Sequence, residues 1–147
     1  GTYTWFQRTS PYPMLLTFDA PDSNVCCVRR ERSNTPLQAL TLLNDAVFFE
    51  SAQALGQRIL RESCCDCRDE RLRFAWELCL ARQPSDEELT IMSRVFDTLL
   101  AQCKAHPEAA GKLSVAKPPE GIEPYEAAAW VALGRTLLNL DEFVTRE

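Results

Sequence analysis

Several features that would place the chain in a functional class are missing from its sequence. No apolar run approaches the roughly 20 residues that a membrane-spanning helix needs, so we expect no direct membrane insertion. Acidic residues outnumber basic ones, giving a formal net charge of −5. A broad basic surface is therefore lacking, and we expect no nucleic-acid partner. The chain also lacks the charged start and apolar block of a signal peptide, so any export signal is expected outside these residues.

What the sequence does contain predicts a single helical domain over residues 1–147. The chain has 147 residues and is 46% hydrophobic, which is enough for one sizeable core but not for two independent ones. Three Trp, three Tyr and seven Phe argue against general disorder. We expect this domain to be the C-terminal part of a larger one.

Residues 1–34 are predicted to form an irregular arm. They show no helical period, and the segments 10–13 and 20–22 carry turn and extended-chain signals. The arm holds many aromatic and aliphatic side chains, too many for a solvated tail. We therefore expect it to pack on the helices or to dock on preceding sequence.

Residues 35–62 are predicted to form a kinked pair of helices. Thr35, Pro36 and Gln38 supply an N-cap hydroxyl, a proline at the first helical position and the third-position amide of a capping box. Asp45 can cap a second helical stretch that carries apolar residues up to Ile59 at helical spacing. The chain should bend between the two.

Residues 69–105 are predicted to form a tight helical hairpin. The first apolar stripe ends before Pro84, and Ser85 with Glu88 forms the capping box of the next helix. Arg82 and Glu88 are predicted to form an ion pair or capping interaction at the corner. The stripes place three side chains in the core, namely Trp76, Cys79 and Cys103.

The remaining chain is predicted to form a loop at 106–121, containing His106, and a C-terminal helix at 122–146. Prolines and glycines crowd the first segment, while the second presents a broad apolar face that includes Trp130. The predicted fold is thus mostly α, with an irregular N-terminal arm packed on a bundle of about five helices. Strand signals are weak, and no internal repeat is present.

A long block of this sequence resembles one family. The block includes Phe18-Asp19-Ala20-Pro21 and the run from Val28 through Ser33-Asn34-Thr35-Pro36-Leu37-Gln38 to Leu40, followed by Leu42-Leu43-Asn44-Asp45. Supporting segments are Arg8-Thr9, the Arg82-x-Pro84-Ser85-x-x-Glu88 corner and the closing Leu138-Asn139-Leu140-Asp141-Glu142-Phe143. Together they resemble a planctomycete-type domain of unknown function at the C-terminal end of large proteins that often carry a planctomycete cytochrome c domain.

The resemblance implies a setting rather than an activity. It implies an exported or periplasmic parent protein, since cytochrome c domains are assembled outside the cytoplasm. It also implies a haem in an upstream domain, with no cofactor in this segment itself. The expected partner is accordingly the upstream remainder of the parent.

The best candidate binding site is a basic run that leads into a helix N-terminus. Arg29, Arg30 and Arg32 precede Asn34 and Thr35, where free backbone N–H groups and the helix dipole favour an anion. The alternative is that these arginines pair with carboxylates and fix the arm to the bundle.

A cysteine cluster is the second candidate. Cys64, Cys65 and Cys67 could contribute to a metal site or form a redox pair. Haem attachment is excluded because Arg68, and not histidine, follows Cys67. Zinc would need completion to four ligands, for example by Cys26 and Cys27. Ordinary loop thiols are the alternative. The family pattern lacks this cluster, which weakens a shared thiol function.

Three functional hypotheses follow from these observations. The first is a non-catalytic helical accessory or interaction module of a larger protein. The second is a part of a hydrolytic or redox enzyme that contributes the arginine run as an anion-binding element. The third is a thiol-based metal or redox site. Asp141 and Glu142, beside Asn139, have no recognisable nucleophile or base nearby, so the sequence leaves open whether the parent is an enzyme.

Overall fold

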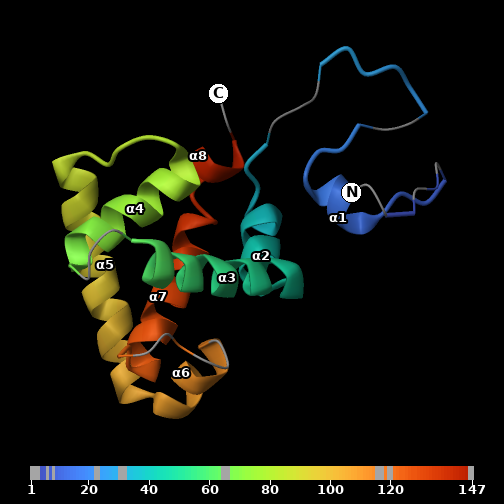
Figure 1. Ribbon diagram of the computed structural model, residues 1–147. Coiled ribbons are helices and arrows are strands. Elements are labelled where there is room, and N and C mark those ends of the chain that lie inside the picture. Colours follow the sequence, from blue (N-terminus) through green and yellow to red (C-terminus); the bar gives the residue numbers. More distant parts are fainter. Residues whose placement is uncertain are drawn as a thin grey trace.

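The computed structural model shows a mostly α-helical protein, as predicted (Figure 1). Within the described residues the helices are α1 (Pro13–Thr17), α2 (Pro36–Asn44), α3 (Ala46–Glu62), α4 (Arg68–Leu80), α5 (Asp86–Ala105), α6 (Pro107–Leu113), α7 (Pro124–Leu137) and α8 (Asp141–Val144). The structure describes residues 4–5, 7, 9–21, 24–29, 33–63, 67–114, 118 and 121–145. In the described part of the chain, no helix is both long and apolar enough to cross a bilayer.

The predicted kinked pair is confirmed as α2 and α3. Thr35 Oγ1 accepts a hydrogen bond from Gln38 N at 3.3 Å, and Gln38 Oε1 accepts one from Thr35 N at 2.9 Å. This reciprocal capping box starts α2 at Pro36. Asp45 is extended, with ψ 139°, and its carboxylate accepts from Val47 N at 2.9 Å. A single aspartate therefore ends α2 and caps α3.

The helical hairpin of α4 and α5 is also confirmed. Ala81 adopts the left-handed conformation, with φ 57°, which ends α4 one residue after Leu80. Ser85 Oγ then accepts from Glu88 N at 3.2 Å, and this capping box starts α5. The short connection between the helices brings Arg82 to the corner.

The core is built around α7, which packs on α3, α5 and α6 (Figure 1). Trp130 of α7 is 1% exposed, and its ring lies 4.4 Å from that of Phe96 on α5. Two glycines allow the backbones of α3 and α7 to approach closely. A Cβ at Gly56 would lie 2.9 Å from Val131 Cγ2, and one at Gly134 would lie 3.3 Å from Ala52 O.

The residues predicted for the core are buried. Trp76, Cys79, Cys103 and Trp130 all lie in the main apolar cluster. Burial raises the pKa of the Cys79 thiol to about 11 and also raises the pKa of Cys103. Both thiols are therefore protonated and shielded, which suits packing rather than thiol chemistry.

The prediction of a loop over 106–121 was wrong for its first half, because residues 107–113 form α6. Proline breaks a helix in its interior, but Pro107 occupies the first helical position, where it loses no hydrogen bond. The helix is retained because Ala110 is buried in the core cluster. In the arm, Pro13 starts the one-turn α1 in the same way, so the prediction of a wholly irregular arm needs correcting too.

The single helix predicted over 122–146 was also wrong, since the chain forms α7 and α8 with a break between them. α7 ends at Leu137, and Leu140 is extended, with ψ 143°. The break turns Leu140 and Phe143 onto the core cluster. A continuous helix would have carried its last residues away from that surface, so burial outweighed helix continuity.

The arm leads away from the helices, and α1 and the segment 24–29 lie to one side of the bundle (Figure 1). Phe18 anchors it, with its ring 5.8 Å from that of Phe48 on α3. Other apolar side chains of the arm face solvent, including Trp5, which is 76% exposed, and Val25. Among its described residues, the arm is thus attached to α2 and α3 through residues 17–19 and 33–34 and is exposed at residues 24–29.

Candidate functional site

A polar cluster, the arm junction, attaches the arm to α2 and consists of Thr17, Asp19, Ser33 and Gln38. Asp19 has φ 54°, a strained backbone conformation for a residue with a side chain. One of its carboxylate oxygens, Oδ2, accepts hydrogen bonds from Ser33 N at 3.0 Å, Ser33 Oγ at 2.7 Å and Gln38 Nε2 at 3.2 Å. These bonds bring the two ends of segment 20–32 together.

Gln38 is the centre of the arm junction and is only 1% exposed. Its Oε1 completes the α2 capping box, while its Nε2 donates to Thr17 O at 2.8 Å and to Ser33 Oγ at 3.0 Å. One buried amide therefore starts a helix and fixes the arm. The hydroxyl of Ser33 is held between a donor and an acceptor, which is the arrangement of a structural lock rather than of an activated nucleophile.

The predicted anion-binding residues are only partly visible. Arg29 is exposed, and Arg30 and Arg32 lie outside the described residues. Asn34 Nδ2 donates to Asp141 Oδ1 of α8 at 2.6 Å, and Thr35 forms the capping box. The side chains of Asn34 and Thr35 thus form hydrogen bonds within the protein. Anion binding at this site remains a prediction.

The predicted thiol site falls largely outside the described residues, because Cys64 and Cys65 are among those not described. Cys67 is exposed and occupies the N-cap of α4. Cys26 and Cys27 are exposed on the arm. Among the described residues no group of three or more histidine, cysteine, aspartate or glutamate side chains could hold a metal ion. Metal or redox chemistry remains a prediction.

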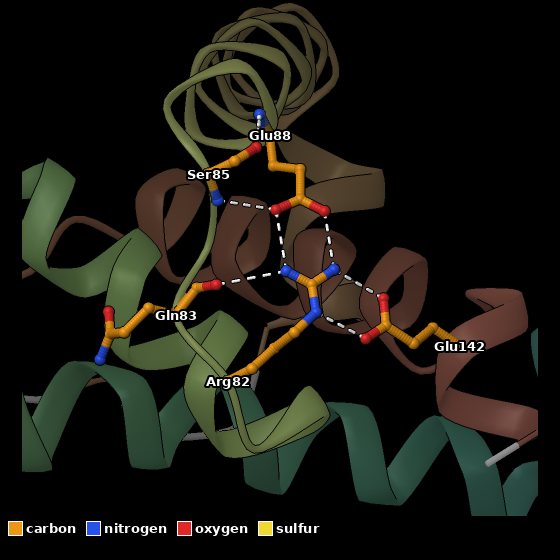
Figure 2. A network of polar contacts seen from close by, with 5 residues as sticks. All are labelled: Arg82, Gln83, Ser85, Glu88 and Glu142. Atoms are coloured by element: carbon orange, nitrogen blue, oxygen red, sulfur yellow. Dashed lines mark hydrogen bonds and ion pairs between the residues drawn. The ribbon is translucent and has the colours of Figure 1, made fainter. Parts of the chain in front are cut away.

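The most extensive polar network surrounds Arg82 at the α4–α5 corner (Figure 2). The guanidinium donates to Glu88 from Nη1 at 2.9 Å and Nη2 at 2.7 Å, and to Glu142 of α8 from Nε at 2.6 Å and Nη2 at 2.7 Å. It also lies 5.1 Å from the ring centroid of Trp76. The predicted pairing of Arg82 with Glu88 is confirmed, and Glu142 is an additional partner 60 residues away in sequence.

The contacts in this corner network favour the charged form of each of its three ionisable groups. Hydrogen bonds from Arg82 and from the backbone of Ser85 lower the pKa of Glu88 to about 2. Arg82 also lowers the pKa of Glu142, and both carboxylates raise the pKa of Arg82. Neither glutamate is suited to accept a proton at neutral pH. The geometry describes a brace that ties α8 to the corner, not a pair of acid–base groups.

Three exposed apolar side chains on α2 and at the start of α3 do not belong to these polar sites. Leu37 and Leu40 are 60% and 57% exposed on α2, and Val47 is 59% exposed at the start of α3. We call these three residues the outer face. Gln38 and Leu42, in contrast, are buried. Leu37 and Leu40 are three residues apart and share a side of α2, as the contact residues of an amphipathic helix do.

These observations define an all-α domain that has a dense helical core, two polar braces and an exposed apolar side. The sequence model of the family PSD1, described as a protein of unknown function (DUF1553), matches residues 1–96, about two thirds of the chain. The chain belongs to this family. No curated protein and no solved structure matches it.

The family match and the folded unit have different limits. The match ends at residue 96, inside α5, while the central helix α7 lies beyond it. The arm junction and the outer face fall within the matched residues. Asp141 and Glu142 lie outside the matched residues, although they bind Asn34 and Arg82 within them. The segment 138–143, which also carries the resemblance, lies outside the match as well.

Proposed function

We propose that this domain is a non-catalytic accessory module of a larger exported protein, and that it binds the preceding part of its parent through the arm and the outer face. The observation that carries the proposal is the exposure of Leu37, Leu40 and Val47 on well-formed helices. Single exposed apolar residues are common, but two that share one side of a helix, as Leu37 and Leu40 do, are typical of a contact surface.

Burial of the outer face against a partner would be energetically favourable. Fully burying a leucine or valine side chain contributes about 1.5–3 kcal/mol. Leu37 and Leu40 could insert side by side into an apolar groove, with Val47 extending the contact past the break at Asp45. This is the helix-in-groove mode of recognition. Trp5 and Leu16 of the arm are exposed as well and would enlarge the buried area.

The non-catalytic part of the proposal rests on the polar sites. Glu88 and Glu142 are ionised and paired with Arg82, and Ser33 is held by Asp19 and Gln38. These groups form internal braces in place of a nucleophile, base and orienting partner. The choice of partner rests on the resemblance to domains at the C-terminal end of large proteins. A cytochrome c domain with its haem in the same parent is part of the proposal.

Calorimetry of this chain against the separately produced preceding part of its parent tests the proposal. We expect binding that is weakened at least about 100-fold by the double variant Leu37→Ser/Leu40→Ser, because two leucine side chains would lose their burial. Ile91→Ser is the matched control, since Ile91 is equally exposed but lies on α5. It should bind like the wild type.

Two outcomes would overturn the docking proposal: no binding by a well-folded chain, or equal binding by the double variant and the wild type. The titrations are run under both reducing and oxidising conditions. Binding that appears under only one of them would favour the thiol-based hypothesis and direct attention to Cys64, Cys65 and Cys67.

A further inference from the structure

The structure assigns a second role to the C-terminal segment: α7 and α8 form a latch that holds α2 at both ends and so sets the direction in which the outer face is presented. This inference rests on the proposed function, because it concerns how the same surface is oriented. The latch residues are Arg135 of α7 and Asp141 of α8. Both are positioning residues, and neither belongs to the outer face.

The C-terminal end of α2 is held by Arg135. Its guanidinium donates from Nη2 to the carbonyl oxygen of Leu43, one of the last carbonyls of α2, and lies 5.6 Å from the ring centroid of Phe49 on α3. A carbonyl in the last turn of a helix has no partner within that helix, so a cation is a favourable one. Arg135 thus binds next to the break between α2 and α3 at Asp45.

The N-terminal end of α2 is held by α8. Asn34 immediately precedes the N-cap residue and donates to Asp141 Oδ1 at 2.6 Å. The same oxygen accepts from Thr145 Oγ1 at 3.1 Å, which orients the carboxylate. α2 is about 14 Å long for its 9 residues at 1.5 Å per residue, so the two contacts fix it at well-separated points.

The latch itself is attached to the core rather than to the arm. Leu140 and Phe143 pack on the apolar cluster, and Glu142 is held by two hydrogen bonds from Arg82. A short one-turn helix can therefore act as a fixed anchor. Loosening either contact should let α2 reorient about Asp45 while α3, α5 and α7 stay packed.

Hydrogen–deuterium exchange of the full chain, read by mass spectrometry, tests the latch without any partner. In Arg135→Met we expect the α2 amides to exchange on the order of tenfold faster, as loss of a charged hydrogen bond predicts. Asn34→Ala and Asp141→Ala should each speed α2 exchange by about threefold, and the double variant by no more than either alone. Exchange in α5 should not change. Arg94→Met, which removes an exposed arginine of α5, is the control.

The same variants are then titrated with the preceding part of the parent. The affinity of each variant for this partner should fall in proportion to the fraction of molecules in which α2 keeps its wild-type orientation. The latch is overturned if α2 exchange stays at the wild-type rate in both Arg135→Met and Asn34→Ala, or if α5 exchange rises equally, which would indicate general destabilisation. Faster α2 exchange together with no binding by the wild type would overturn the proposed function and leave the latch standing.

Discussion

Apolar side chains of the same types are buried around α7 but exposed on the side of the molecule that carries the arm and α2. Around α7, Trp130 is buried against Phe96, and glycines draw α3 onto α7. On the arm side, Trp5 and the two leucines of the outer face are exposed, although α2 is as regular a helix as α7. One side therefore buries its apolar side chains within the fold, while the other leaves apolar side chains exposed, as the docking proposal requires.

The polar contacts divide in the same way. The arm is fixed by the buried amide of Gln38, by part-buried hydrogen bonds to Asp19 and Ser33, and by the exposed bond between Asn34 and Asp141, each of which contributes modestly to stability. The core is held mainly by apolar packing, since α7 packs on α3, α5 and α6 around one buried cluster. We therefore expect changes in the core to affect unfolding and changes on the arm side to affect binding.

Replacing the core tryptophan should have the largest effect on stability. Trp130→Ala removes a large buried side chain and leaves a cavity, so the free energy of unfolding should fall by about 3–5 kcal/mol in urea denaturation. Trp5→Ala is the matched control and should change it by less than about 0.5 kcal/mol, because Trp5 is exposed. Equal losses in the two variants would contradict the comparison between the two sides.

A single added methyl group should have the next largest effect. Gly56→Ala gains up to about 1 kcal/mol of helix propensity but places a Cβ against Val131, so we expect a net loss of about 1–2 kcal/mol. Gly111→Ala has no atom within 4 Å of its new Cβ and should be neutral or stabilising. The contact is not as tight as described if Gly56→Ala proves as stable as Gly111→Ala by thermal unfolding.

The corner network should appear as a pH dependence of stability. The pKa of folded Glu88 is about 2, below its ordinary value of 4.5, so its stabilising contribution is complete above about pH 4.5 and is lost as the pH falls toward 2. Glu88→Gln should therefore lower stability near neutral pH and flatten the acid decline. Urea denaturation between pH 2 and 7 measures this. The control Glu87→Gln, at an exposed neighbouring position, should keep the wild-type profile.

The smallest effect on stability is expected at the outer face. Leu37→Ser/Leu40→Ser changes two exposed side chains, so the free energy of unfolding should fall by less than about 1 kcal/mol, mostly through helix propensity. Chemical denaturation of the double variant checks this. A much larger loss would mean that the two leucines pack within the fold, and the docking proposal would lose its basis.

Local signals predicted much of the fold because they act within a few residues. The capping boxes at Thr35 and Ser85 placed the starts of α2 and α5, and apolar periodicity placed Trp76 and Trp130 in the core. The errors arose where the same residue type serves two purposes. Proline both breaks and starts helices, and Pro107 starts α6. Apolar periodicity continues past Asn139 and predicts a longer helix, although α7 ends at Leu137.

The polar sites were harder to predict, since their partners are far apart along the chain. Arg82 with Glu88 spans six residues and was anticipated, whereas Glu142 lies 60 residues away and was not. Anion binding by Asn34 stays a prediction, whereas the hydrogen bond from its amide to Asp141 was not anticipated. No local pattern distinguishes an asparagine that binds a ligand from one that binds a distant carboxylate.

By itself, the sequence determined the helices, most of their starting points and the side chains able to fill a core, because capping and periodicity are properties of neighbouring residues. For other apolar residues on the helices, burial followed from the packing of the helices and not from local sequence. Three leucines illustrate this, since each lies within a regular helix. Leu37 and Leu40 face solvent, whereas Leu133 is 1% exposed. Burial depends on which helix packs against which, and here the packing of α7 on α3 and α5 decides it.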